Sequence, residues 1–445
     1  MPVTTTHPHY DLYKDKVSRV RSCYQGSDAV KEKGTEYLPK LGGQSQAEYD
    51  AYLNRGYFLP TVEPTITALV GAVMRKASII ELPSSIDYLI DSVDGNIREF
   101  DLFLSFSLNE LMQAGRVGAL VEHDGERVKI LSYRHEHIIN WSSDFVVLKQ
   151  CYIEPDEKDE FVMLEKDEYL ELRIVEGVYI QRKWRQTKSG WAVVDTIMPT
   201  NRGEPIDYIP FVCCNSVEVS IEPSMPALLS ITDVNLDHYR LSTDLRHGLH
   251  WTALPTLFVW GDLEDDDGNK AKISVGSGRG NHIADTEGRA ELLEFTGAGL
   301  GSVSDTIAEC VVAMAGLGAK MLASNSGGVK AAETARIESS SQTATLSTLA
   351  GSVEAFAQEV LKICAMWESG EGEINVKLNR DYIDASIEPA KILALLQALQ
   401  SGSISVDTFL DNLMRGEILP KGVDIEDEKE KIINEGRSTV ELDGE

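Results

Sequence analysis

Two pairs of histidines stand close enough in the sequence to share a metal ion. His135 and His137 flank Glu136, so their imidazoles would lie on one face of a strand, while His247 and His250 would lie on one face of a helix. A structural zinc ion takes four ligands, mostly Cys and His. Neither pair has a third and a fourth ligand nearby in the sequence, so we expect no metal site and no cofactor.

Two further segments resemble ligand-binding loops, but each lacks a feature that the chemistry requires. Gly276-Ser-Gly-Arg-Gly280 is glycine-rich, yet no Gly-Lys-Ser/Thr follows it and no strand–turn–helix pattern surrounds it, as in a phosphate-binding loop. When Gly268 is aligned with the sixth position of a calcium loop, Leu263 takes the first position, where an acid is required. We interpret the segment 262–268 as a hydrated acidic loop.

The sequence argues against two further classes of protein, enzymes and tight nucleic-acid binders. No Gly-x-Ser-x-Gly elbow or other nucleophile motif is present, so the sequence gives no reason to propose an enzyme. The chain has 445 residues with 42 Lys and Arg against 71 Asp and Glu, a net charge of −29. Tight binding to nucleic acid requires clustered basic residues, so a protein that grips DNA through its phosphates is excluded.

The ends and the cysteines indicate a cytoplasmic setting. The N-terminus shows no charged-then-apolar signal pattern, and the longest largely apolar stretch, Cys310–Ala319, is too short to span a membrane. The six cysteines have no Cys-x-x-Cys spacing, and the adjacent Cys213 and Cys214 are poorly placed to bridge each other. We therefore expect reduced thiols and no membrane partner.

The hydrophobic pattern predicts a mixed α+β fold. Residues 1–116 are mostly helical in spacing, whereas residues 117–215 alternate as strands separated by glycine turns. A helix is expected from Ser224, as its N-cap, to about Trp251, and another over 300–322. The first of these helices has many polar residues, which indicates partial exposure or packing against polar neighbours.

Three other segments carry specific expectations. Glu154–Glu171 holds nine acids and two lysines and is interpreted as a solvated loop and strand edge. A long helix is expected over Ala331–Trp367, with an apolar stripe only in its second half, so its first half needs neighbours, most readily other subunits. Short helices are expected over 389–400 and 406–415, the latter with Ser405 as N-cap.

Several segments in register resemble the portal proteins of tailed bacteriophages over roughly residues 25–415. No single segment is diagnostic, but the order is shared. The segments include Val30-Lys-Glu-Lys-Gly-Thr-Glu-Tyr-Leu-Pro39, Tyr49-Asp-Ala-Tyr-Leu-Asn-Arg55, Leu69-Val-Gly-Ala-Val-Met-Arg-Lys76, Ile209-Pro-Phe-Val, the stretch from Asp237 to His250, Leu292-Leu-Glu-Phe-Thr-Gly-Ala-Gly-Leu300, Leu317-Gly-Ala-Lys-Met-Leu322 and Ser403-Ile-Ser-Val-Asp-Thr-Phe409.

The resemblance implies a portal fold and a non-enzymatic function. Such proteins form a homo-oligomeric ring, usually a dodecamer, at one capsid vertex of the virion. Viral double-stranded DNA is packaged and ejected through the ring, which docks terminase, head-completion or adaptor proteins, and capsid and scaffolding protein. On this chain the implied parts are a wing (1–223), stem helices (224–252 and 300–320), a clip (253–299), a tunnel loop (321–330), a long helix returning to the wing (331–388) and a C-terminal crown with an acidic tail (389–445).

The resemblance also assigns roles to two groups of residues. The tunnel loop that faces the DNA channel would contain Lys320, Ser324, Asn325, Ser326, Gly327, Gly328 and Lys330. The clip that docks the motor or adaptor would contain Asp262, Glu264, Asp265, Asp266, Asp267 and Arg279. Assembly would take place in the cytoplasm of the host bacterium.

Two alternatives to a DNA channel remain at this stage. One is another structural shell component, either a coat protein, which should form sheets or shells, or a head–tail adaptor, which is usually much shorter. The other is an acidic hydrolase, which would need a reactive cluster that the sequence does not reveal.

Overall fold

The structure is a computed structural model that divides into two compact units, Met1–Leu378 and Asn379–Glu445. The residues it describes are 2–123, 125–156, 158–159, 161–252, 256–260, 289–293, 297, 299–318, 332–380, 397–398, 403–405, 408 and 410. Helices and strands alternate in blocks, so the mixed α+β class expected from the sequence is confirmed.

The central helix of the larger unit is α5, in which ten of fifteen residues are buried. It is enclosed because it packs against α1, α4 and α8 and against strands β2 and β3. Phe103 of α5 stacks on Phe356 of α8 with ring centroids 5.8 Å apart. The N-terminal helices are α1 (Pro8–Gln25), α2 (Ser27–Glu32), α3 (Gln46–Arg55), α4 (Val62–Val73) and α5 (Phe100–Ala114).

The expected helical region 1–116 is interrupted between α4 and α5. Strand β1 (Ile79–Glu81) and the short 3-10 helices η1 (Gly34–Glu36) and η2 (Asp87–Leu89) occur within it. Pro83 has no amide hydrogen to donate, and Gly95 adopts a positive φ of 77°, so a helix cannot continue through this stretch.

Two antiparallel sheets follow. The first has the strand order β11-β2-β3, and the second runs in chain order from β4 to β8. In β2, Gly118 lets Phe211 of β11 pack across the strand, because a Cβ at this position would lie 2.6 Å from Cζ of Phe211. The strands are β2 (Arg116–His123), β3 (Val128–Arg134), β4 (Ile138–Trp141), β5 (Phe145–Pro155), β6 (Met163–Val175), β7 (Val178–Thr187), β8 (Gly190–Ile197) and β11 (Phe211–Asn215), with a short pair β9 (Thr200–Asn201) and β10 (Glu204–Pro205) and the 3-10 helix η3 (His135–His137).

The acidic stretch 154–171 is only partly the solvated loop and strand edge that its charge suggested. Its second half forms β6, which is the middle strand of the five-stranded sheet. Glu168 and Glu171 are both 5% exposed. Arg185 lies 2.5 Å from Glu168, while Glu171 pairs with Arg173 and accepts a 2.9 Å hydrogen bond from the indole of Trp184. Arginines on the same or the adjacent strand compensate these carboxylates, which composition alone does not reveal.

The two edges of the five-stranded sheet differ. The outer edge of β4 is met by the N-terminal segment 5–7, because the His7 amide donates to the Ile139 carbonyl at 2.9 Å and the Asn140 side chain donates to the Thr5 carbonyl at 2.9 Å. His7 also stacks on Trp141 at 4.0 Å. Among the described residues, no strand pairs with the outer edge of β8.

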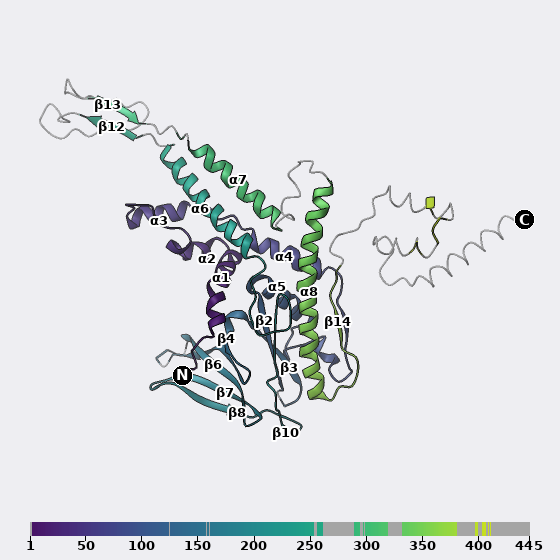
Figure 1. Cartoon of the computed structure of the whole chain (residues 1–445). Coiled ribbons are helices and arrows are strands. Elements are labelled where there is room, and N and C mark those ends of the chain that lie inside the picture. The colour runs from purple at the N-terminus through teal and green to yellow at the C-terminus, as the bar shows by residue number, and fades with distance from the viewer. Residues whose placement is uncertain are drawn as a thin grey trace, which may run out of the picture. The chain divides into compact units, whose positions relative to one another are not determined.

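Helices α6 (Leu229–Thr252) and α7 (Leu300–Gly316) lie side by side as a pair (Figure 1). Between them in the chain, β12 (Thr256–Trp260) and β13 (Arg289–Leu293) form an antiparallel hairpin. Helix α6 starts five residues after the expected N-cap, because Ser224 instead donates its hydroxyl to the Gly115 carbonyl at 2.8 Å.

Helix α8 (Ala332–Glu368) closes the larger unit. Val353, Phe356, Val360 and Cys364 are fully buried where the helix packs on α5, β2, β3 and β11, which confirms the apolar stripe expected in its second half. The chain then returns as β14 (Asn375–Lys377), which pairs with β1.

Few residues of the smaller unit are described. Within them the Ser405 hydroxyl accepts a 3.1 Å hydrogen bond from the Thr408 amide, as an N-cap would, while the helices expected over 389–400 and 406–415 lie largely outside the described residues.

Candidate functional site: the α6–α7 pair

Some polar residues of α6 face inward while Asp237, Asp244 and Arg246 are exposed, so the helix combines the partial exposure and the polar packing that its sequence indicated. Thr232, Asn235 and Thr243 are fully buried. Both threonine hydroxyls donate to carbonyls four residues earlier, at 2.9 Å and 2.7 Å. The Asn235 side-chain amide donates to the Leu59 carbonyl at 2.9 Å. Because these buried donors are satisfied, α6 can be enclosed by the N-terminal helices without an apolar stripe along its whole length.

Charged and aromatic groups then attach α6 to α1 and α3. Arg19 of α1 lies 2.6 Å from Asp233, and the Arg240 guanidinium donates to the Tyr37 carbonyl at 2.8 Å. Tyr52 of α3 donates its hydroxyl to Asp244; burial, reinforced by this carboxylate, raises the pKa of Tyr52. These contacts hold α6 against the N-terminal helices within the larger unit.

The two histidines near the end of α6 face an arginine. The Nη atoms of Arg55 lie 3.4 Å from Nδ1 of His247 and 3.1 Å from Nε2 of His250. A guanidinium has only donors, so both facing ring nitrogens act as acceptors. Burial, and then the charge of Arg55, lower the pKa of His247. The pair therefore contributes to the junction between α3 and α6.

The other histidine pair lies in η3. His135 is 1% exposed and stacks on Tyr10 with centroids 5.4 Å apart. Among the described residues, no group of three or more His, Cys, Asp or Glu side chains could hold a metal ion. All six cysteines are described, and none forms a disulfide.

Helices α6 and α7 approach closely at a glycine. A Cβ on Gly248 would lie 2.7 Å from Cδ2 of Leu300, so the missing side chain makes room for the start of α7. At the other end of α7, Met314 is 2% exposed and its sulfur accepts a hydrogen bond from the Thr61 hydroxyl at 3.6 Å. Gly248 was not predicted to be a contact residue, although a glycine inside a helix is itself a signal of close packing.

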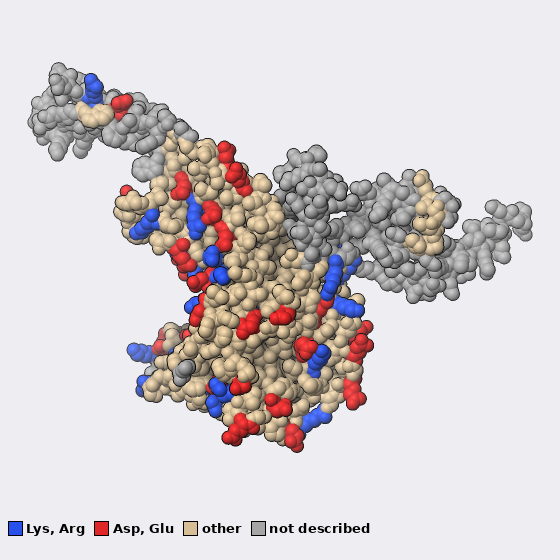
Figure 2. Space-filling model, in the orientation of Figure 1, with Lys and Arg blue, Asp and Glu red and all other residues tan. Residues whose placement is uncertain are grey.

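The outer surface of α7 is apolar and acidic. Val311, Val312 and Leu317, at and just beyond its C-terminal end, are 43%, 64% and 47% exposed. The helix contains two acids, Asp305 and Glu309, and no Lys or Arg. In Figure 2, red acidic side chains lie along the visible edge of the α6–α7 pair. These side chains form a small exposed apolar surface on a helix without basic residues.

The residues assigned to the tunnel loop and to the clip lie outside the described residues. These are Lys320, Ser324, Asn325, Ser326, Gly327, Gly328 and Lys330 in the first group, and Asp262, Glu264, Asp265, Asp266, Asp267 and Arg279 in the second. The described elements that flank them are α7 and α8 around the first group and β12 and β13 around the second. In the described part of the chain, no helix is long and apolar enough to span a membrane.

One family model matches the part of the chain that contains this pair. Residues 227–368, from α6 through α8, match the family model described as "Domain of unknown function (DUF4055)". No curated protein matches the chain.

Solved chains that resemble this one come from particles of a gene transfer agent. A chain of the native virion is 11% identical, with a TM-score of 0.42, and the match covers 88% of this chain and 99% of that one. A chain from the neck of the empty particle is 12% identical with a TM-score of 0.41, covering 86% and 96%. A chain from the neck of the native particle is 13% identical with a TM-score of 0.38, covering 87% and 99%. At TM-scores below 0.5 these likenesses carry no argument about function.

Proposed function

We propose that this chain is a portal protein, which forms a ring-shaped channel at one vertex of a phage capsid. Double-stranded DNA is packaged and ejected through the ring. The ring also docks terminase, head-completion or adaptor proteins, and capsid and scaffolding protein. In this role the chain carries no catalytic residue and no cofactor.

The observation that carries the proposal is the order of elements from α6 to α8. A helix leaves an α+β unit, a small β-hairpin follows, a second helix returns beside the first, and a 37-residue helix then packs on the sheets of the same unit. This order supports the assignment of 224–252 and 300–320 as stem, 253–299 as clip, 321–330 as tunnel loop and 331–388 as the return to the wing. The wing is residues 1–223, and the crown with its acidic tail is 389–445.

The charge of the chain suits a channel through which DNA slides. At physiological salt the Debye length is about 8 Å, so acidic walls repel phosphates only at short range. A subunit with a net charge of −29 therefore keeps DNA from adhering without preventing its entry. The exposed valines of α7 suit a ring in which a neighbouring copy covers them.

Electron microscopy of the purified protein, with mass by light scattering, tests the proposal. We expect rings with a central hole and a total mass about twelve times the subunit mass of 49.1 kDa. Replacing Val311 and Val312 by Asp should leave a folded monomer, because buried unpaired carboxylates oppose association. Val217→Asp, on a 73% exposed side chain in the wing, is the matched control and should still form rings.

Other assemblies would overturn the proposal. Sheets or closed shells would indicate a coat protein, and a small stable dimer would indicate an adaptor. Rings formed equally well by the α7 double variant would remove α7 from the subunit interface.

A further inference from the structure

The first residues of the chain are held on the edge of β4 mainly through His7. The His7 amide donates to the Ile139 carbonyl at 2.9 Å, and the Thr5 carbonyl accepts a 2.9 Å hydrogen bond from the Asn140 side chain. The His7 ring stacks on Trp141 with centroids 4.0 Å apart and 25° between the ring planes. The backbone and the side chain of one residue therefore both contact this strand.

The same ring also caps helix α1. His7 is the N-cap of α1, and its Nδ1 accepts a 3.2 Å hydrogen bond from the His9 amide. An imidazole nitrogen accepts a hydrogen bond only while it carries no proton. This geometry therefore requires a neutral His7 with its proton on Nε2, and a doubly protonated ring would lose the capping contact.

Charged groups from other elements surround the stacked rings. Glu222, in the segment between β11 and α6, accepts a 2.9 Å hydrogen bond from the Trp141 indole. Its other carboxylate oxygen lies 2.6 Å from Nδ1 of His9. The guanidinium of Arg116, on β2, lies 4.5 Å from the centroid of the Trp141 ring. A proton on His7 would thus add a second cation to a ring that already contacts one.

Burial lowers the pKa of His7 below its ordinary value of 6.5. Among the described residues, Glu222 opposes this effect, His9 and Arg116 lower the pKa further, and Asp11 raises it slightly. The docked segment therefore binds a proton less readily than a released segment, whose His7 is exposed to water. Docking is complete above pH 6.5 and weakens as the pH falls below that value.

A second contact persists in mild acid. Nδ1 of His9 must donate to Glu222, because a carboxylate has only acceptors, so a further proton on His9 would leave this bond intact. Burial raises the pKa of Glu222, but hydrogen bonds from His9 and Trp141 outweigh it and hold the pKa below 4.5. The carboxylate thus stays charged at pH 5.5, and the start of α1 remains anchored.

We propose that residues 2–7 form a latch on the edge of β4, which opens in mild acid when His7 takes up a proton. The contact between His9 and Glu222 retains α1 while the latch is open. Opening frees the Ile139 carbonyl from its hydrogen bond with the segment. The proposal rests on contacts within the larger unit and does not depend on the portal assignment.

Hydrogen exchange of the full chain at pH 7.5 and pH 5.5 tests the latch, with rates corrected for the intrinsic effect of pH on exchange. We expect the protection of the His7 amide to fall by about threefold or more at pH 5.5. The enclosed helix α5 should keep its protection, because only the segment is released. Unchanged protection of the His7 amide, or an equal fall in α5, would overturn the proposal.

Two variants test whether His7 is the group that takes up the proton. His7→Asn keeps a side-chain acceptor for the cap, and His7→Phe keeps an aromatic ring beside Trp141, but neither side chain titrates. At pH 5.5, at least one of them should protect the amide of residue 7 better than the unaltered chain does. Protection no higher than in the unaltered chain for both variants would overturn the proposal.

The matched control is a histidine of β2 that lies away from the latch. Nε2 of His123 is 3.8 Å from Glu368, and His123→Asn should open in acid like the unaltered chain. A His123 variant that stays closed at pH 5.5 would show that His7 is not the sensor.

Discussion

At the scale of single residues, two buried groups govern how the larger unit responds to pH and to mutation. Both ring nitrogens of His135 lack a hydrogen-bond partner among the described residues. Burial, and then the charge of Arg116, lower the pKa of His135 to about 3. Glu136 and Arg21 also face the ring, and Tyr10 stacks on it. The folded protein therefore keeps this imidazole neutral in mild acid.

We expect His135→Phe to flatten the acid dependence of stability. In the unfolded chain, His135 binds a proton below its ordinary pKa of 6.5, whereas the folded chain binds it only near 3. Stability is therefore lost as the pH falls from 6.5 towards 3. Urea unfolding at pH 7 and pH 4.5 measures the change. The variant should match the unaltered chain within about 1 kcal/mol at pH 7 and lose less at pH 4.5. Equal losses would show that His135 does not set this response.

The second group is an ion network that joins α1, α5 and η3. Arg21 is 13% exposed in its side chain and pairs with Glu110, which is 3% exposed. Arg21 also contacts Glu136 at 2.7 Å and donates to the Gln113 side chain at 2.7 Å. Burial raises the pKa of Glu136, but hydrogen bonds from Arg21 outweigh it and hold the pKa at about 2. One guanidinium thus compensates two carboxylates from separate elements.

Arg21→Met should destabilise the fold by about 3–5 kcal/mol, because it leaves Glu110 buried with only Arg134, a more exposed side chain 3.5 Å away, as a cationic partner. Denaturant midpoints measure the effect, and adding Glu110→Met should restore much of the loss. The control is Lys362→Met, which breaks a pair whose side chains are 56% and 48% exposed and should cost less than about 1 kcal/mol. A loss for Arg21→Met no larger than the control's would contradict this account.

Residue types alone did not predict which side chains are buried and which residues they pair with. Glu168 and Glu171 look like part of a solvated acidic run, yet the pairing of β6 with β7 brings Arg185 and Trp184 to them. The histidine pairs show the same limit, since neither Arg55 nor Tyr10 is near its partner in the sequence. Contacts between segments distant in the sequence decide which side chains are buried and paired, and these contacts cannot be predicted from composition.

At the scale of elements, the helical and strand periods located most of the fold. The long helix α8 occurs where its pattern predicted it, and β6, β7 and β8 lie within the strand region predicted over 117–215. Helix α6 was predicted to start at Ser224, but that hydroxyl bonds instead to Gly115, a left-handed residue whose Cβ would lie 2.3 Å from the Ser224 carbonyl. A tertiary contact therefore overrode a good local capping signal.

The contact between α6 and α7 should be sensitive to any side chain at Gly248. We expect Gly248→Val to cost about 1–3 kcal/mol, because the new methyl groups would displace Leu300. Hydrogen exchange of the α7 amides measures the loosening. Gly71→Val is the matched control: Gly71 lies inside α4 with open space around it, and the change should be neutral or slightly stabilising. Unchanged protection of α7 in the Gly248 variant would show that this contact does not hold the pair.

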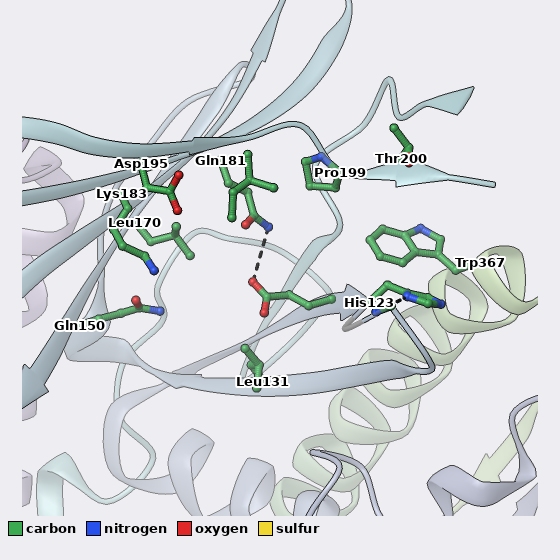
Figure 3. A pocket seen from close by; sticks show the side chains of 13 residues that line it. His123, Leu131, Gln150, Leu170, Gln181, Lys183, Asp195, Pro199, Thr200 and Trp367 are labelled. Atoms are coloured by element: carbon green, nitrogen blue, oxygen red, sulfur yellow. Dashed lines mark hydrogen bonds between the residues drawn. The ribbon is translucent and has the colours of Figure 1, made fainter. Parts of the chain in front are cut away.

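At the scale of the whole molecule, the sequence supplied the portal hypothesis through the order of its segments, whereas the proposed loop and clip residues lie outside the described part. A cavity of about 580 Å³ between the two sheets (Figure 3) could not be predicted, because its lining comes from eight separate elements and two loops. Charge and length could exclude classes of protein, but only three-dimensional packing could indicate this cavity.

The portal proposal makes a separate prediction for residues 321–330. Gly327→Pro together with Gly328→Pro should impair packaging or retention of DNA, because proline fixes φ near −65° and removes the freedom that a loop against moving DNA requires. Packaged DNA per particle is the measurement, and electron microscopy should still show assembled rings. The double alanine variant is the control. Normal DNA content in the proline variant would exclude this segment as the tunnel loop.

The N-terminal segment along β4 has a consequence for how copies of the chain associate. Residues 5–7 occupy one edge of the five-stranded sheet, so only the edge at β8 is open to strand addition among the described residues. A chain without residues 2–7 would have two open edges on opposite sides of one sheet. Copies could then join edge to edge without closing, and the product would be a fibril that lengthens at both ends. Residues 5–7 therefore limit strand addition at the β4 edge, where Arg116 also donates to the Ile138 carbonyl.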